Sequence, residues 1–238
     1  MNAKELYQAG KIDEAIQLLA SGLRKDPTDT WQRTFLFELL CFAGDLDRAE
    51  KQLDILSDTG KEAGMGTLIY RSAIHAERLR REMFEQKTFP QTEVEPTSGA
   101  LLNGVACTTV EDADPRIGPR LEVYAAGSYL WLPFAHIACI RMEAPKRVRD
   151  LIWIPAVLKT GPRCGGFDLG EVMIPALTPF AYRHPDDSVR LGRQTVWEQV
   201  EDMQVPVGQK MLLVDGEEFP ILEVRSLEFP AAAQTAAE

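Results

Sequence analysis

Histidine and cysteine are scarce in this chain of 238 residues, which contains three His and four Cys. The cysteines, Cys41, Cys107, Cys139 and Cys164, are scattered, and only His136 and Cys139 have the close spacing of structural zinc ligands. We expect the thiols to be reduced and to pack as small apolar side chains. The sequence therefore predicts neither a disulfide framework nor a metal site, and no cofactor.

Long apolar runs and an excess of positive charge are also missing. No apolar run approaches the roughly 18 residues that cross a bilayer, and the first residues lack a signal-peptide pattern. The net charge is −10, whereas a protein that neutralises nucleic-acid phosphates is expected to be basic. We expect a cytoplasmic protein without membrane insertion and without general DNA or RNA binding.

The acidity belongs mainly to the second part of the chain. Residues 1–90 carry 13 Lys and Arg against 15 Asp and Glu, a net charge of −2, and the remaining residues carry 13 against 21, a net charge of −8. The hydrophobic fraction of 45% and the charged fraction of 26% are typical of a globular protein. Nothing in this composition indicates global disorder.

A seven-residue segment near the N-terminus recurs once. Ala-Gly-Lys-Ile-Asp-Glu-Ala at residues 9–15 returns as Ala-Gly-Asp-Leu-Asp-Arg-Ala at residues 43–49. The offset of 34 residues is the period of tetratricopeptide helix-turn-helix repeats. Gly10 and Gly44 can form the turn between paired helices without a Cβ penalty. The N-terminal third is therefore expected to be a binding scaffold.

Apolar spacing predicts five helices, at about residues 3–9, 12–25, 30–42, 46–56 and 62–86. Two and a half repeats are too few for a free-standing solenoid, so something must cover its open end. The longest helix has an apolar stripe that can cap the array: Leu68, Ile69, Ile74, Leu79 and Met83. Its arginines form either a solvated face, which we prefer, or an anion-attracting patch: Arg71, Arg78, Arg80 and Arg81.

Helical periodicity ends at residues 87–98, where Pro90 and Pro96 lie, and short apolar or alternating runs follow. These predicted strands are residues 121–124, 129–132, 137–140, 151–154, 172–174, 210–214 and 221–224. Turn residues separate them, at 126–128, 161–162 and 165–166, and residues 215–216 are expected to close a terminal hairpin. A short helix is expected near residue 135 or residue 147.

The pattern as a whole predicts an α+β multidomain protein. A tetratricopeptide-like α-helical domain is expected at residues 1–88 and a linker at residues 89–98. A mainly antiparallel β domain, either a sheet or a partial barrel, is expected at residues 99–229. Residues 230–238 are expected to form a flexible tail.

One segment of the second half has side chains suited to acid–base catalysis. His184 precedes Asp186 and Asp187, and Arg193 follows them. An enzyme of unknown reaction with its site here is the alternative to a binding function. Neighbouring side chains on an extended segment point to opposite faces, so we prefer a structural role in which a carboxylate caps or pairs with Arg190 or Arg193.

The tryptophans suggest two different roles. Trp131, Trp153 and Trp197 lie among apolar residues and are expected in the core. Trp31 opens the second repeat. The first helix of each tetratricopeptide repeat lines the concave groove of the array, so Trp31 is expected to face this groove. Trp31 and Tyr7 could equally be wedged between helices. The same register predicts the other residues of this candidate partner groove: Lys4, Tyr7, Thr34, Glu38, Cys41, Leu68, Ser72 and His75.

Several segments of the second half occur in a characteristic order. They are Gly-Ser-Tyr-Leu-Trp-Leu-Pro at residues 127–133, Asp-Leu-Ile-Trp-Ile-Pro-Ala at 150–156, Gly-Glu-Val-Met-Ile-Pro-Ala at 170–176, residues 187–197, and Val-Gly-Gln-Lys at 207–210. Together with the helical repeats before them, they resemble the ImpE family, also called SciE-like or TagJ. The residues of this structural family motif are Trp131, Asp150, Trp153, Asp187, Arg190, Gly192, Arg193 and Trp197.

The resemblance implies a cytoplasmic, non-enzymatic accessory protein of a bacterial type VI secretion system. It implies contact with the small subunit of the contractile sheath and, through it, a link to the ATPase that disassembles the sheath. We expect residues 3–86 to hold a helix of that subunit, because an amphipathic helix in an apolar groove is a common recognition mode. A self-assembling structural component is a third hypothesis, and the sequence leaves the oligomeric state open.

Overall fold

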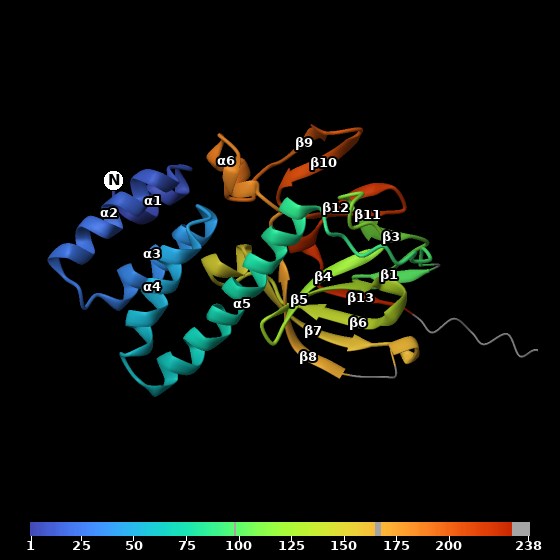
Figure 1. The fold of residues 1–238 in the computed structure, drawn as a ribbon, viewed down its shortest axis with the longest axis horizontal. Coiled ribbons are helices and arrows are strands. Elements are labelled where there is room, and N and C mark those ends of the chain that lie inside the picture. The colour runs from blue at the N-terminus through green and yellow to red at the C-terminus, as the bar shows by residue number, and fades with distance from the viewer. Residues whose placement is uncertain (98, 165–167, 230–238) are drawn as a thin grey trace, which may run out of the picture.

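The computed structural model describes residues 1–97, 99–164 and 168–229. Helices form the N-terminal part and sheets form the rest of the chain (Figure 1). The predicted flexible tail at residues 230–238 and the predicted turn at residues 165–166 lie outside the described residues. Within the described residues, no helix is both long enough and apolar enough to cross a membrane.

The five predicted helices are confirmed, and each end agrees to within one residue. They are α1 (Ala3–Gln8), α2 (Ile12–Lys25), α3 (Thr30–Phe42), α4 (Leu46–Ser57) and α5 (Lys61–Gln86). Residues 89–97 of the predicted linker contain no helix or strand. The agreement reflects a local cause, because apolar residues at helical spacing recur along the whole segment.

The sequence repeat is also a repeat of backbone geometry. Gly10 and Gly44 both have a positive φ, +74° and +76°. In the first turn the amide of Gly10 donates to the Tyr7 carbonyl (3.0 Å) and the next amide donates to the Leu6 carbonyl (2.9 Å). In the second turn the corresponding bonds, 34 residues later, measure 3.1 and 2.9 Å. Glycine suits both turns because it adopts this conformation without steric cost.

The second part contains short strands and single-turn helices. The strands are β1 (Ala100–Leu102), β2 (Val105–Cys107), β3 (Val110–Asp112), β4 (Arg120–Ala125), β5 (Ser128–Pro133), β6 (Ile137–Met142), β7 (Trp153–Thr160), β8 (Asp168–Pro175), β9 (Thr195–Val200), β10 (Met203–Gly208), β11 (Met211–Val214), β12 (Glu217–Pro220) and β13 (Ser226–Glu228). The helices are η1 (Phe134–His136), η2 (Val148–Leu151), η3 (Pro162–Cys164), η4 (Ala181–Arg183), α6 (Asp187–Arg190) and η5 (Ile221–Glu223).

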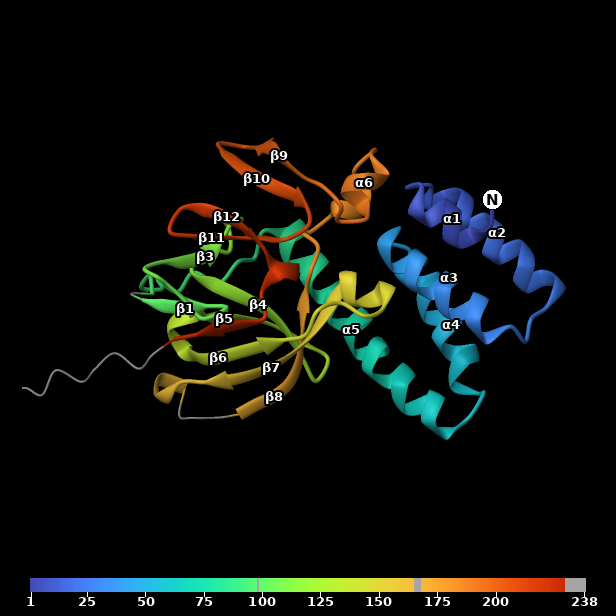
Figure 2. The ribbon, with the colours of Figure 1, turned by 180° about the vertical axis from the view of Figure 1, so that it is seen from behind.

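The strands form one large antiparallel sheet and two small ones (Figure 2). The order in the large sheet is β2-β1-β13-β6-β7-β8-β4-β5, and the small sheets are β12-β11-β3 and the β9–β10 hairpin. The large sheet ends in two different edge strands, so it is open and not closed into a barrel. This confirms the predicted fold class.

Two of the predicted strands are wrong in detail, and strands β1, β2, β3, β9, β10 and β13 were not predicted. Residues 221–224 form a turn of 3₁₀ helix instead of a strand, and this turn places Ile221 and Val224, three residues apart, together in the core. The run at 151–154 is divided between η2 and β7. The hairpin at residues 215–216 is confirmed, but β13 follows it. A short helix was expected near residue 135 or residue 147, and the structure has one at both places, η1 and η2.

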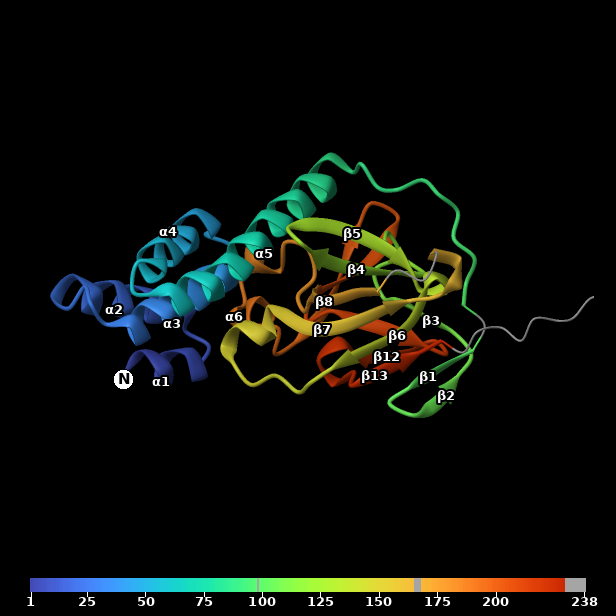
Figure 3. The ribbon, with the colours of Figure 1, turned by 90° about the horizontal axis from the view of Figure 1, so that it is seen from below.

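The helical part and the β part share an interior. One cluster of buried side chains runs from the helices to residues of the second part, among them Tyr124, Trp153 and Leu191. A second cluster combines residues of the large sheet with Val110 and Leu212 of the three-stranded sheet. Helix α5 lies between the other helices and the large sheet (Figure 3). Because it contributes to the first cluster, it joins both parts.

Candidate partner-binding surface

The inner side of the helical array is covered by the chain itself. Arg149 of η2 donates to Glu38 of α3 (Nη1 to Oε1, 2.9 Å) and to the hydroxyl of Tyr70 on α5 (2.8 Å). Glu38 is buried. Burial raises the pKa of its carboxyl, although Arg149 opposes that rise. Glu38, which was predicted to face a partner protein, is therefore already paired with an arginine of the same chain.

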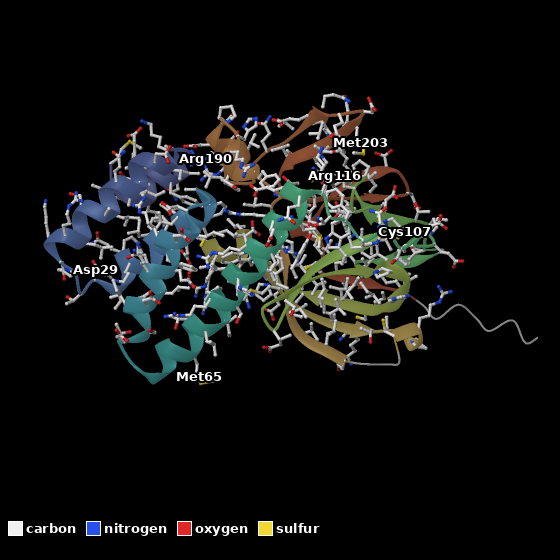
Figure 4. The ribbon with its side chains drawn as sticks, viewed as in Figure 1. Asp29, Met65, Cys107, Arg116, Arg190 and Met203 are labelled. Carbon is white, nitrogen blue, oxygen red and sulfur yellow. The ribbon has the colours of Figure 1, made fainter. Side chains whose placement is uncertain are left out.

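Helix α6 holds the start of α2 in a similar way. The carboxylate of Asp187 accepts the Ile12 amide (2.9 Å) and pairs with Arg190 (2.6 Å). Arg190 also reaches Asp13 of α2 at 3.3 Å, and Figure 4 shows it beside the N-terminal helices. These contacts connect segments about 175 residues apart. They confirm the preferred structural role of this carboxylate.

The other residues of the candidate catalytic segment also have structural partners. Arg193 donates to the Tyr7 and Gln8 carbonyls (2.6 and 2.9 Å). Asp186 caps α6 by accepting the Ser188 amide (2.8 Å), which lowers its pKa. The nitrogen Nδ1 of His184 accepts the Asp186 amide (3.0 Å). The hollow beside these residues is open and lies at the junction with the α1–α2 turn.

The nine predicted groove residues are not gathered on one open surface. Glu38 and Cys41 are buried, and Tyr7, Thr34 and Ser72 are half-buried. The others are exposed: Lys4, Trp31, Leu68 and His75. The Tyr7 ring packs edge-on against Phe35 (5.8 Å) and beneath the Arg193 guanidinium (5.0 Å). That these nine residues line a partner groove stays a prediction.

The family-motif residues of the β part mostly stabilise the junction and its loops. Trp153 is buried and stacks on Tyr70 of α5, with ring centroids 6.5 Å apart. Asp150 accepts the amides of Lys146 and Arg147, both at 2.9 Å, and so holds the loop before η2. Gly192 has a φ of +64°, and a Cβ there would lie 2.5 Å from the Leu177 side chain.

The remaining two tryptophans of the motif differ in burial. Trp131 is half-buried and stacks on Phe89 of the connecting segment (5.7 Å). Trp197 is 38% exposed and donates to Glu218 (3.0 Å). Its predicted place in the core is wrong, because the β9–β10 hairpin that carries it is not part of the large sheet.

A fully buried charge cluster joins α5 to the sheets. Arg80 of α5 makes two bonds to Glu122 of β4 (2.7 and 2.8 Å), and Lys210 reaches the same carboxylate (2.5 Å) and also pairs with Asp112. Burial opposes ionisation of Glu122, but the two cations lower its pKa to about 2. Burial raises the pKa of Asp112 to about 7, against the effect of Lys210.

The preferred interpretation of the α5 arginines is therefore wrong for Arg80. Arg80 shares the buried side of α5 with Ala73 and Phe84, whereas Arg71 and Arg78 form ion pairs on the partly exposed side with α4 (2.6 and 2.8 Å). The carboxylate partner lies in β4, 42 residues away in sequence. The Val-Gly-Gln-Lys segment at residues 207–210 contains the second buried cation of the cluster, Lys210.

An open cleft lies between the first half of α5 and the outer face of the large sheet. Its volume is about 590 Å³. Strand alternation builds its floor: Pro155 and Val157 of β7 and Met173 of β8 face outward, while Leu158 and Ile174 point into the core. The floor is apolar as a result.

Helix α5 and the loop after β6 form the walls of this cleft. Ile69 of α5 is 54% exposed, and Leu68 and Met65 continue the apolar strip outside the cleft at 63% and 77%. The opposite wall contains Lys146 and Arg147. Figure 4 places Met65 at the end of α5 far from the sheet. We name this feature the α5–sheet cleft.

The predicted capping stripe on α5 is consequently wrong in part. Ile74 is buried and Met83 packs against the core, but Leu68, Ile69 and Leu79 stay exposed. Helix α5 packs on α4 and on β5, and the exposed residues leave an unpaired apolar surface. Of the predicted groove residues, Ser72 lines the α5–sheet cleft, and the exposed Leu68 precedes Ile69, which also lines it.

Comparison with known proteins gives consistent results for both parts. The model of the ImpE protein family matches residues 104–228, and a tetratricopeptide repeat model matches residues 6–63. The chain is 32% identical, over 263 aligned positions covering 96% of it and 91% of the relative, to the type VI secretion system accessory component TagJ of Pseudomonas aeruginosa. It also resembles a crystal structure of a Vibrio parahaemolyticus protein, with a TM-score of 0.83, coverage of 97% and 98%, and 23% identity. That likeness concerns the fold alone.

Proposed function

The chain belongs to the ImpE family of type VI secretion accessory components, and we propose that it is a non-enzymatic adaptor that binds the small subunit of the contractile sheath. Through that subunit it links the sheath to the ATPase that disassembles it. This action takes place in the cytoplasm. The partner contributes a helical segment, which suits an elongated apolar surface.

The observation that carries the proposal is the α5–sheet cleft. Contiguous exposed apolar surface on a folded protein commonly marks an interaction site. The cleft adjoins Met65, Leu68 and Ile69, which are exposed along one side of α5. The inner side of the array is engaged by Arg149 and Arg193 of the same chain. Partner binding is therefore assigned to the cleft and not to the groove within residues 3–86.

The use of the candidate catalytic residues supports an adaptor without chemistry. A general base needs a carboxylate or imidazole that can reach a substrate. Asp187 is instead held by Ile12 and Arg190, and Arg193 is held by two carbonyl groups of α1. We therefore prefer the adaptor over an enzyme with its site at His184.

Titration of the full chain with the purified small sheath subunit from the same secretion cluster tests this function. We expect saturable binding with a Kd of about micromolar order in isothermal titration calorimetry. The same subunit added to an unrelated tetratricopeptide protein is the control. Heat no larger than in this control would contradict the proposal. The full chain is required because the helices and the sheet share a core.

A further inference from the structure

We infer that the edge strand β2 of the large sheet is a self-association surface, on which a second copy of this chain pairs its own β2 antiparallel across a two-fold axis centred on Ala106. The surface lies apart from the α5–sheet cleft and does not depend on which partner that cleft binds. The inference rests on the exposure of β2, the direction of its backbone groups and the fit of a second copy.

The fold protects its other sheet edges but leaves β2 open. Helix α5 packs on β5, the opposite edge strand of the large sheet, and the edge strand β12 carries Glu217, Glu218 and Pro220. In the described part of the chain no strand pairs with the outer side of β2, and Figure 3 shows this strand on the side of the sheet away from α1–α4. Residues 99–110 contain neither charge nor proline, the devices that commonly prevent edge-to-edge pairing.

The hydrogen bonds of β1 show which of its backbone groups face β2. The Asn103 amide, directly after β1, donates to the Ser226 carbonyl of β13 (2.8 Å). Leu101 pairs with Glu228 of the same strand. Because the hydrogen-bonding groups of an antiparallel strand alternate in direction, Leu101 faces β13, and the residues on either side of it face β2.

The register then fixes the direction of the groups on β2. Leu102 pairs with Val105 and Ala100 pairs with Cys107. Val105 and Cys107 therefore direct their N–H and C=O groups towards β1. Ala106 lies between them and directs its N–H and C=O away from the sheet, so a second copy of Ala106 placed opposite can exchange two hydrogen bonds with it.

An apolar side chain is exposed at this edge. Val105 is 70% exposed, and it lies on the same face of the sheet as its partner Leu102, which is buried in the second core cluster. Cys107 also packs against that cluster. In a dimer centred on Ala106, Val105 lies opposite Cys107 of the second copy. The pairing thereby covers the open end of the core in both copies.

Asp215 limits which strand can pair with β2. Its Oδ1 atom accepts the amides of Thr108 and Thr109 (2.8 and 2.9 Å), so the carboxylate occupies the edge just beyond Cys107. A longer strand from another protein would place a side chain against this carboxylate. In the two-fold pairing the residue opposite Thr108 is Gly104 of the second copy, which has no side chain. The edge therefore fits a second copy of itself.

The two-fold arrangement also keeps like charges apart. Thr108 of one copy and Thr108 of the other are four residues apart along the paired strands, which is about 14 Å at roughly 3.4 Å per residue. This exceeds the screening length of about 8 Å at physiological ionic strength. The Asp215 carboxylates that cap these two residues therefore repel each other only weakly.

The short contact predicts a weak dimer with two binding sites. Pairing involves about five residues of each copy, and interfaces below about 1,200 Å² are typical of transient association. We expect a Kd of roughly 10–100 µM. Each copy keeps its α5–sheet cleft, because β2 contributes no residue to it. The dimer is therefore bivalent, which raises its avidity for any assembly that repeats the partner subunit.

Sedimentation equilibrium of the full chain tests the dimer. From about 1 µM to about 300 µM, the weight-average mass should rise from 26.6 kDa towards twice that value. Ala106→Pro removes the outward N–H and leaves the ladder to β1 intact, and it should raise the Kd at least about tenfold. Val105→Asp should do the same, because it places a charge in the apolar contact. Val157→Asp is the matched control, since Val157 is an exposed valine on β7, which has a strand on either side.

A disulfide tests the register. Val105 and Cys107 of the second copy form a non-hydrogen-bonded pair, with Cα atoms about 4.5 Å apart, a separation that a disulfide spans. Val105→Cys should give a covalent dimer on mild oxidation, and peptide mass spectrometry should find position 105 linked to Cys107. Val157→Cys should remain a single chain on a non-reducing gel.

Two results would overturn the inference. One is a mass of 26.6 kDa at every concentration. The other is association that is equally strong in the original chain and in Ala106→Pro and Val105→Asp, because a different surface would then form the dimer. Circular dichroism checks that each variant is folded, and Val105→Asp decides the matter alone if the proline variant is not. Neither result affects the proposed function, which the titration with the sheath subunit tests separately.

Discussion

Replacement of Glu122 by glutamine tests the buried charge cluster that joins α5 to the sheet. Glu122 is fully buried and accepts two bonds from Arg80, one from Lys210 and one from the Tyr129 hydroxyl (2.5 Å). Glu122→Gln keeps the size of the side chain but removes its charge. Two buried cations then lose their main counter-charge, and the new amide places N–H groups beside other donors.

The size of the effect follows from the pKa of Glu122. A pKa of about 2, compared with the ordinary 4.5, corresponds to about 3 kcal/mol at roughly 1.4 kcal/mol per pKa unit. Loss of one partner from a buried ion pair costs a similar amount, about 3–5 kcal/mol. At roughly 2–4 °C per kcal/mol for a chain of this size, we expect the melting temperature to fall by roughly 6–20 °C.

The assay is urea denaturation followed by circular dichroism at several pH values. Because the folded-state pKa lies below the unfolded-state value, the charge of Glu122 stabilises the fold above about pH 4.5 and ceases to do so as the pH falls through about 2. The difference between the original chain and Glu122→Gln should shrink over that window. Glu50→Gln is the control, because its pair with Arg78 lies on the partly exposed side of α5 and should contribute less than about 1 kcal/mol. Equal losses in the two variants would refute the reasoning.

Further predictions concern one buried acid and two glycines. In Asp112→Asn, the free energy of unfolding relative to the original chain should rise by about 3 kcal/mol from pH 4 to pH 7, because the pKa of Asp112 rises from 3.8 to about 7 on folding and its ionisation destabilises the fold. Urea denaturation at several pH values checks this, and a difference between the two chains that does not change with pH would contradict it. Gly44→Ala should destabilise by more than about 1 kcal/mol, because φ is +76° and a Cβ would lie 2.2 Å from the Tyr182 ring. Gly66→Ala, in an open position on α5, should instead raise the melting temperature through a gain of up to about 1 kcal/mol.

The helices could be predicted from sequence because their signals are local. Apolar residues recur at helical spacing, and Gly10 and Gly44 mark the two turns. Strands β1, β2, β3 and β13 were missed because each is three residues long, too short to show alternation. The six-residue strands β9 and β10 were missed as well, and β9 has no buried residue that would give it an apolar face. Residues 221–224 contain apolar residues suited to either a strand or a helical turn, and the position of the core decides between them.

The site could be predicted only in part, because its contacts are long-range. The tetratricopeptide register predicts that Glu38 faces a partner, but Arg149 of the same chain contacts Glu38 from 111 residues away. Arg80 stands in an arginine-rich segment that is otherwise typical of a solvated helix face. Only the position of Glu122 opposite it shows that it is buried. The exposure of Ile69 likewise depends on how far α5 extends past the sheet.

Hydrogen exchange of the full chain, measured by mass spectrometry with and without the small sheath subunit, tests the central claim most directly. The amides of exposed α5 residues and of the outer strands report on the cleft, and those of α1 and α3 report on the array. Binding at the α5–sheet cleft predicts slower exchange at residues 65–73, 153–157 and 171–173. Slower exchange confined to residues 3–42, with no change at those three segments, would contradict it.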